Sequence, residues 1–180
     1  MMEDVASARP AGPPGGSLER SDDGATTTSW DVSVAGDHVE RLMIELFDEH
    51  WGSLTVGPII EGAAYEIRFT EHPKISMLDG YLTVDTGPWH FHLCVNDHRG
   101  ASSAEQSRVR RVARAAFFRA EGGGCVPGSW GLQLWNGRGE QMITVLFPNP
   151  YLDETMERRT EPDWTKTALW EDLRSRYTAR

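Results

Sequence analysis

The chain has 180 residues, with 18 Lys and Arg against 27 Asp and Glu, and a formal net charge of −9. Such an acidic chain lacks the basic face that duplex nucleic acid requires, and no apolar run approaches the roughly 18 to 20 residues that cross a bilayer. The N-terminus shows no apolar block of a secretory signal, and two Cys cannot form a disulfide framework. We therefore expect a cytoplasmic protein with no membrane span and no duplex nucleic acid partner.

Residues 1–36 are rich in Pro, Gly, Ser, Thr and Asp and contain few apolar side chains. A segment of this composition cannot bury enough surface to offset the entropy lost on ordering. We expect a disordered tail over residues 1–36, with Trp30 and Val32 as the side chains that could dock on the domain. Residues 37–180 have the length of one domain.

A helix is expected directly after the tail, because apolar residues there recur at helical spacing. The stripe consists of Val39, Leu42, Met43, Leu46 and Phe47. Asp37 is the expected N-cap with Glu40 three residues on, and Gly52 follows the end of the helix.

Strands are expected next. A first strand lies around residues 54–56, where Pro58 indicates a bulge or an edge that could support a homodimer. Residues 65–70 alternate between apolar and polar, as a half-buried strand does. Asp79-Gly80 predicts a tight turn between strands at 75–78 and 81–84.

Residues 89–95 form the most informative expected strand. Successive side chains of a strand point to opposite faces, so one face is apolar throughout. The other face carries His90, His92 and Cys94, three potential metal ligands at i, i+2 and i+4.

The C-terminal part predicts a hairpin and a final helix. Residues 102–120 fit either a helix or a short helical turn followed by a strand at 112–118. Residues 130–135 and 141–147 flank an Asn136–Gly139 turn, and the last helix starts within 161–166. Strands in sequence with helices at the N- and C-terminal ends predict a single α+β domain, with an antiparallel sheet of about six to eight strands.

The histidine-bearing strand is the sharpest candidate for chemistry. Imidazole is the commonest metal ligand, and His90 with His92 and Cys94 could hold Zn or Fe, with His98 as a further donor. The alternative is a polar strand face covered by loops. Cys94 and Cys125 could be ligands or small buried side chains.

Five arginines between residues 108 and 119 form a basic segment within the acidic chain. They could hold carboxylates or phosphate, or could be a solvated face paired with the chain's own acids. The five are Arg108, Arg110, Arg111, Arg114 and Arg119. We find no P-loop, Rossmann glycine pattern, nucleophile elbow or H-E-x-x-H.

Several segments of the chain resemble the haem-utilisation superfamily, which includes hemin-degrading factors and single-domain cytosolic haem carriers. These segments read AAFFR at 115–119, SWGLQLWNGRGEQM at 129–142, DTGPW at 85–89 and ALWEDL at 168–173. The resemblance implies an α+β fold with a large antiparallel sheet, and a strand rather than a helix at 112–118. It also implies iron-porphyrin binding and, in some members, oxidative haem opening. The chain is a single unit rather than a tandem pair, and we carry over none of the family's axial-ligand histidines.

Haem binding or trafficking is therefore the first functional hypothesis, with His90 or His92 as the axial donor. Arg111 or Arg114 would meet a propionate, and Tyr81, Trp130 and Trp135 would supply the apolar wall. The second hypothesis is a small non-haem Zn or Fe metalloenzyme on the His90/His92/Cys94 face. The third is a non-catalytic interaction domain.

Overall fold

The computed structural model describes residues 15–22, 24–60, 62–122 and 126–178, so residues 1–14 of the expected tail and Cys125 lie outside the described residues. The helices within these ranges are α1 (His38–Glu49), α2 (Ala104–Arg110) and α3 (Ala168–Thr178), with 3-10 turns at Trp51–Ser53 and Trp164–Thr167. The strands are β1 (Ser17–Arg20), β2 (Thr26–Val32), β3 (Thr55–Gly57), β4 (Ile59–Ile60), β5 (Ala63–Ala64), β6 (Ile67–Arg68), β7 (Lys74–Leu78), β8 (Tyr81–Asp85), β9 (His90–Cys94), β10 (Val112–Glu121), β11 (Gly128–Asn136) and β12 (Gln141–Leu146). None of the described helices is long and apolar enough to cross a membrane.

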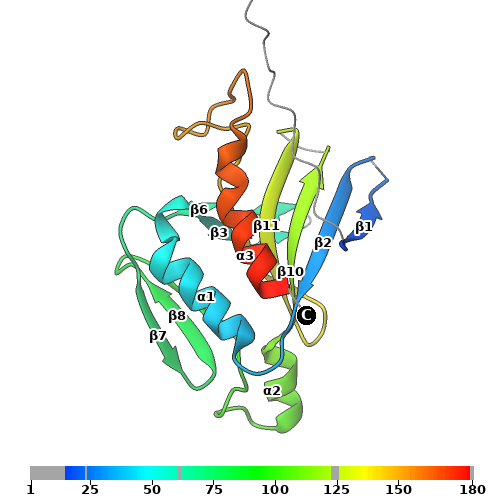
Figure 1. Cartoon of the computed structure of the whole chain (residues 1–180). Helices are drawn as coiled ribbons and strands as arrows, with labels where there is room; N and C mark the ends of the chain where they lie inside the picture. Colours follow the sequence, from blue (N-terminus) through cyan, green and yellow to red (C-terminus); the bar gives the residue numbers. More distant parts are fainter. Residues whose placement is uncertain (1–14, 23, 61, 123–125, 179–180) are drawn as a thin grey trace, which may run out of the picture.

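Seven strands form the main sheet in the order β1-β2-β10-β11-β12-β3-β6, with every neighbouring pair antiparallel. Helices α1 and α3 lie in front of this sheet (Figure 1). Strands β7, β8 and β9 form a separate antiparallel sheet, which we call the small sheet, and β4 pairs with β5. The fold is a single α+β domain, and the expected class and strand number are confirmed.

The core lies between the main sheet, the two long helices and one face of the small sheet. Phe47 of α1 contacts Phe91 of β9, with ring centroids 5.5 Å apart. Trp170 of α3 meets Trp30 of β2 at 5.4 Å and Phe117 of β10 at 6.2 Å. Burial of these large apolar side chains is the main stabilising term, and it fixes the small sheet against α1.

Helix α1 forms as expected, and all five residues of the apolar stripe are buried. The expected capping box is wrong. Asp37 has φ −96° and ψ 13° instead of the extended conformation of a capping residue, and its side chain makes no cap hydrogen bond. Its carboxylate pairs with Arg41 at 3.3 Å instead, and the Glu40 carboxylate accepts a hydrogen bond from Asn96.

The expected tail boundary differs from the structure. Residues 17–20 and 26–32 form strands, and β2 pairs with β10 from Thr26↔Glu121 to Val32↔Ala115. Trp30 and Val32 are buried, at 5% and 4% exposure. The described end of the expected tail is thus an interior strand, because docking on β10 gives its backbone partners and places Trp30 against α3.

The ambiguous segment contains both expected elements in succession. Helix α2 ends at Arg110, and β10 follows from Val112 to Glu121, so the strand at 112–118 is confirmed. Ser103 caps α2 by accepting a hydrogen bond from the Gln106 backbone N–H at 3.1 Å. The expected hairpin is also confirmed as β11 and β12.

The expected strand at 65–70 is mostly wrong. Only Ile67 and Arg68 pair with β3, and Tyr65 is 63% exposed. The backbone carbonyl of Tyr65 passes so close to Gly57 that an added Cβ there would lie 1.6 Å from its oxygen. Residues 55–60 and 62–68 therefore form a hairpin that is interrupted at Gly57 and Tyr65, where the Tyr65 N–H donates to the Pro58 carbonyl at 3.0 Å, and this interruption shortens the strand.

The turn at Asp79-Gly80 forms as expected between β7 and β8. Both residues have positive φ, 50° and 89°, as a two-residue hairpin turn requires. A Cβ at Gly80 would lie 2.5 Å from the Asp97 carbonyl oxygen, so this close approach also requires glycine. The turn fixes the register of the small sheet, which carries the candidate site.

Candidate functional site

The outer face of the small sheet is a polar surface that points away from the core. Its side chains form three cross-strand rows because β7, β8 and β9 pair without a register shift. The rows are Lys74–Asp85–His90, Ser76–Thr83–His92 and Leu78–Tyr81–Cys94. On the inner face, Leu82, Val84 and Leu93 are buried. The alternation expected for residues 89–95 is therefore present.

His90 and His92 lie side by side on this outer face, and both are exposed. Their ring centroids are 5.0 Å apart at an interplanar angle of 67°. Nδ1 of His92 hydrogen bonds Thr83 Oγ1 at 2.8 Å, and no described residue hydrogen bonds Nε2. When Nδ1–H donates to Thr83, the Nε2 lone pair is available to a ligand in a ring whose orientation is fixed.

Cys94 lies on the same strand face but is almost fully buried, at 3% exposure. Its thiol donates a hydrogen bond to the Asn96 backbone carbonyl at 3.3 Å. Burial raises the pKa of the Cys94 thiol, which keeps it protonated, whereas a metal ligand must be a thiolate. Within the described ranges, the one set of three His, Cys, Asp or Glu ligand atoms within 4.8 Å of one another lies elsewhere. The structure thus brings the two histidines together without Cys94.

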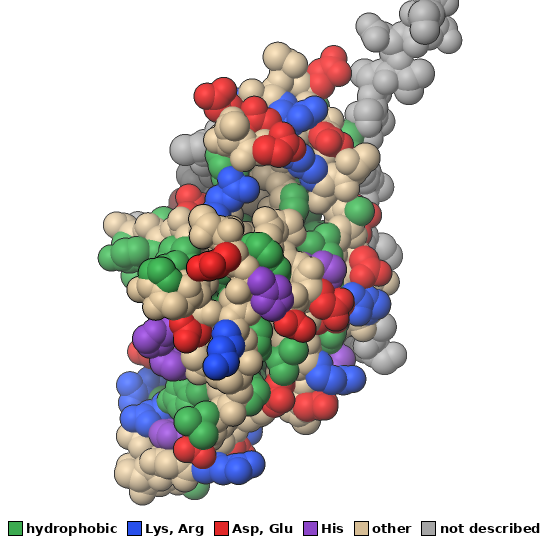
Figure 2. All heavy atoms as spheres, turned by 90° about the vertical axis from the view of Figure 1, so that its left-hand side faces the viewer, with side chains coloured by type: hydrophobic (Ala, Val, Ile, Leu, Met, Phe, Trp, Pro, Cys, Tyr) green, Lys and Arg blue, Asp and Glu red, His purple; other side chains and the backbone are tan. Residues whose placement is uncertain are grey.

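Cationic side chains flank the end of the small sheet next to Cys94. Arg110 donates a hydrogen bond to His98 Nδ1 at 3.1 Å, and the His98 ring meets Tyr81 edge-on at 5.1 Å. Arg111 pairs with Asp97 at 2.8 Å, and both of these side chains are exposed. Burial, and then the Cys94 thiol, raise the pKa of Tyr81. On the face of the molecule that Figure 2 draws, histidines lie beside Lys and Arg side chains at the lower end.

The remaining expected site residues lie in two other places. Arg114 pairs with Asp31 at 3.1 Å and stacks over Trp135, with its guanidinium carbon 4.4 Å from the ring centroid. Trp130 is buried among Tyr151 and Trp164 on the opposite strand face to Trp135. The expected apolar wall is therefore not assembled, because Tyr81 lies on the small sheet and the two tryptophans lie on the main sheet.

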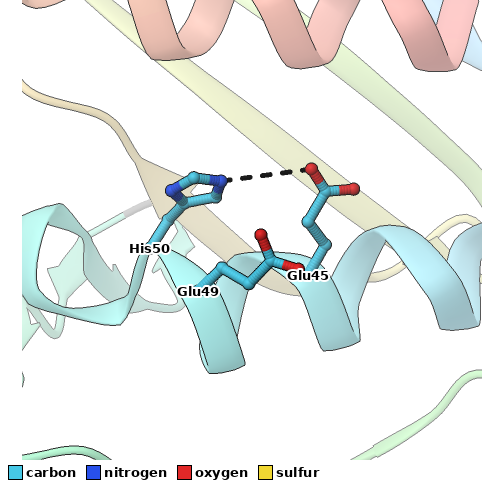
Figure 3. A group of neighbouring side chains, drawn as sticks. All are labelled: Glu45, Glu49 and His50. Carbon is cyan, nitrogen blue, oxygen red and sulfur yellow. Dashed lines mark ion pairs between the residues drawn. The ribbon is translucent and has the colours of Figure 1, made fainter.

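A cluster that the sequence analysis did not single out lies at the end of α1. Glu45, Glu49 and His50 bring their ligand atoms within 4.8 Å, with His50 Nε2 4.0 Å from Glu45 (Figure 3). The i, i+4 spacing of two glutamates before a histidine is the signal that could have found it. Glu45 is already occupied: it accepts hydrogen bonds from the Arg176 guanidinium and, at 2.6 Å, from the Tyr177 hydroxyl.

These bonds join α1 to α3. The Arg176 hydrogen bond is the main reason that the pKa of Glu45 is lowered, and burial followed by Glu45 raises the pKa of Tyr177 to about 12. An ion at Glu45 would have to displace both partners. We therefore interpret this cluster as a structural joint between the helices.

A cavity of about 760 Å³ opens at the end of the main sheet beneath the loop that precedes α3. Its floor includes Phe118, Gln133, Thr144 and Leu146 from β10, β11 and β12. The described residues that line it include no histidine. The surface of this cavity is mostly apolar, whereas the outer face of the small sheet is polar.

The comparison with solved structures identifies proteins of the same fold. The heme-binding protein ChuX is 14% identical with a TM-score of 0.53, and the match covers 84% of this chain and 78% of ChuX. Protein AGR_C_4470 from Agrobacterium tumefaciens is 16% identical with a TM-score of 0.54, covering 83% of this chain and 71% of that protein. At these identities the likeness shows a shared fold. No curated protein sequence matches the chain.

A family model settles the sequence relationship. It matches residues 17–179, which begins at β1 and thus includes the two strands that precede α1. The chain belongs to the family described as "Family of unknown function (DUF7676)".

Proposed function

We propose that the protein binds an iron-porphyrin on the outer face of the small sheet, with His92 Nε2 as the axial ligand of the iron. The observation that carries the proposal is the exposed imidazole of His92, whose Nδ1 is held by Thr83 at 2.8 Å. A protein ligand to haem iron is commonly a histidine whose second nitrogen is fixed by a hydrogen bond. The likeness of the fold to the heme-binding protein ChuX supports the same ligand class.

The residues around His92 offer a porphyrin a donor, a sheet surface and cations, whereas the expected tryptophan wall lies on the main sheet. Same-strand neighbours on this face are spaced by roughly 7 Å, so a planar macrocycle would cover several rows. Lys74 lies in the row on one side, and Arg110 contacts His98 beyond the row on the other. These cations, with Arg111, supply partners for propionate groups. Haem, when bound, supplies the redox-active iron, and this chain supplies the donor, the platform and the charges.

His90 is the second imidazole of this site, 5.0 Å from His92 between ring centroids. Unlike His92, its ring makes no hydrogen bond to a described side chain, so its orientation is less constrained. We propose that it replaces His92 only when His92 is absent. Arg114 and Trp130 have no part in this proposal because they lie on the main sheet. A homodimer through the edge near Pro58 stays a prediction.

The test is a hemin titration of the full chain followed at the Soret band, with His92→Ala, His90→Ala and the double variant. We expect one hemin per chain, at least tenfold weaker binding for His92→Ala, and a smaller loss for His90→Ala. His72→Ala is the matched control, because His72 is an exposed imidazole that contacts the Asp48 carbonyl instead. Unchanged affinity and an unchanged Soret band in the double variant would overturn the proposal.

A non-haem Zn or Fe site is the second candidate, and the paired rings of His90 and His92 favour it. It has less support, because catalytic zinc sites generally use three protein ligands and the Cys94 thiol is a buried donor. Metal analysis of protein purified without haem separates the two. Stoichiometric Zn or Fe in colourless protein that is lost in the double histidine variant would favour this candidate.

A further inference from the structure

The cavity at the end of the main sheet is a separate chamber with its own chemistry. Its volume of about 760 Å³ lies in the range of small-molecule sites, which are mostly apolar with a few convergent polar groups. Phe118 and Leu146 supply apolar floor, and Pro148, Leu152 and Met156 supply the opposite wall from the loop. The chamber therefore suits a ligand with an apolar body.

Two cations converge at one side of this chamber. Lys166 Nζ donates to the Leu152 carbonyl at 2.6 Å and pairs with the Glu154 carboxylate at 3.4 Å. Arg68 donates to the Glu154 backbone carbonyl at 3.3 Å. Both cations line the cavity, and the Lys166 side chain is only 17% exposed. The carboxylates of Glu66, Asp153 and Glu154 also line it, and Asp153 Oδ1 already accepts hydrogen bonds from Thr155 and from the Glu157 backbone N–H. A half-buried ammonium beside an apolar wall is a natural partner for a ligand carboxylate.

The carboxylate that now partners Lys166 is easily replaced. The Glu154 side chain is 83% exposed, so solvent screens its ion pair with Lys166. A ligand carboxylate that reaches Lys166 from inside the cavity would be shielded from water by Leu152 and Met156. The exchange would return Glu154 to solvent, where its charge is fully hydrated.

The described lining offers no imidazole and no described thiolate to a metal ion. Its carboxylates, Glu66, Asp153 and Glu154, do not bring three ligand atoms within 4.8 Å of one another. Its requirements therefore differ from those of the imidazole pair on the small sheet.

We propose that this cavity is a second ligand site, independent of the porphyrin site, for a small amphiphile with an apolar body and one carboxylate that pairs with Lys166. The apolar body lies against Phe118 and Leu146, and Gln133 and Thr144, which hydrogen bond each other at 3.3 Å, form the polar part of the floor. Arg68 lies beside the carboxylate. Charge at one side and apolar wall elsewhere select an acid over the corresponding alcohol.

The experiment is isothermal titration of the full chain with sodium decanoate, and with decanol as the uncharged control. We expect saturable binding of one decanoate per chain and at least tenfold weaker binding of decanol. Lys166→Met should remove this preference, whereas Lys166→Arg should retain it. Arg138→Met is the control, because Arg138 is an exposed cation that lines neither this cavity nor the proposed porphyrin site.

Two further measurements make the outcome decisive. Thermal unfolding shows whether Lys166→Met remains folded, and Ala120→Leu, which fills part of the cavity, gives a second route if it does not. Equal binding of decanoate and decanol, equal losses in Arg138→Met and Lys166→Met, or no binding would overturn the proposal. Displacement of decanoate by one equivalent of hemin would overturn the independence of the two sites. Hemin binding without decanoate binding would reject the cavity site and leave the proposed porphyrin site standing.

Discussion

The outer face of the small sheet and the cavity at the end of the main sheet differ in what they offer a ligand. The face is open and carries imidazoles, with Thr83 fixing His92. The cavity has a mostly apolar surface, with Lys166 at one side and no histidine in its described lining. The comparison teaches that this fold separates a histidine-bearing surface from a mostly apolar enclosure. A ligand that needs both an imidazole donor and an apolar enclosure would not find the two together in either region.

The largest expected effect comes from removing the support of the histidine face. Leu82 is fully buried on the inner face of the small sheet, directly between outward-facing residues. Leu82→Ala leaves a cavity there and should cost about 2–5 kcal/mol of unfolding free energy. Denaturant unfolding measures the loss, and hemin affinity should fall more than decanoate affinity does. Leu78→Ala, at a side chain that is 71% exposed, should change stability by less than about 0.5 kcal/mol.

A subtler change separates the two regions without unfolding either. Thr83→Val keeps the shape of the side chain and removes the hydroxyl that holds His92. Loss of such an outer partner typically weakens a metal site by about 10- to 100-fold, so hemin affinity should fall by about tenfold and decanoate affinity should not change. Thr83→Ser should keep the affinity. Equal hemin affinity in Thr83→Val and the wild type would show that ring orientation by Thr83 has no role.

Stability in acid tests the joint between α1 and α3, which belongs to neither the small-sheet face nor the cavity. The folded-state pKa of Glu45 is lowered from its ordinary value of 4.5, chiefly by Arg176. The stabilisation is therefore present above that value and is lost as the pH falls through the lower folded pKa. Glu45→Gln should cost roughly 1 kcal/mol near neutral pH, discounted because Arg176 is partly exposed, and should flatten the acid loss. Unfolding curves between pH 7 and pH 3 measure both.

The control for that joint is Asp172, which pairs with Arg176 from the same helix at 2.9 Å and is 60% exposed. Asp172→Asn should change stability by less than about 0.5 kcal/mol. An equal loss in Asp172→Asn and Glu45→Gln would contradict the assignment of the stabilisation to the contact between helices.

The smallest effect is expected in the loop above the cavity. Met156 has a φ of 67°, a left-handed conformation that costs a residue with a side chain about 1 kcal/mol. Met156→Gly relieves this cost but makes the unfolded chain more flexible, so the net gain should be roughly 0.5 kcal/mol. Met156→Ala keeps the strain and should show no gain in thermal unfolding. Both variants should weaken decanoate binding to a similar degree, because both remove the thioether wall.

The parts of the fold that the sequence predicted are those with a local periodic signal. The five apolar residues of α1 are all buried, and the outward position of His90 and His92 follows from strand alternation alone. Trp130 shows where the expected site failed. It shares a strand face with Leu132 and Leu134, which are both fully buried, so the same alternation rule that places the histidines outward places Trp130 inward.

The failures have tertiary causes. Strand β2 is rich in Thr, so its apolar content resembles a tail, and its β-branched residues are the signal that could have found it. Cys94 shares a strand face with two exposed histidines but is covered because the chain turns back through Asn96. The cavity joins strands to a loop that comes later in the sequence, and no local pattern indicates such a meeting.

The interior position of β2 has a consequence for the order in which the molecule can assemble. Thr26–Val32 pairs with the nearby β1 on one side, but its other partner is Ala115–Glu121 and its tryptophan rests against Trp170, both much later in the chain. Contacts of such large sequence separation slow folding, because a long loop must close before they form. During synthesis, this β-prone segment therefore waits without its second partner until β10 has been made, and α3 then completes the packing around it.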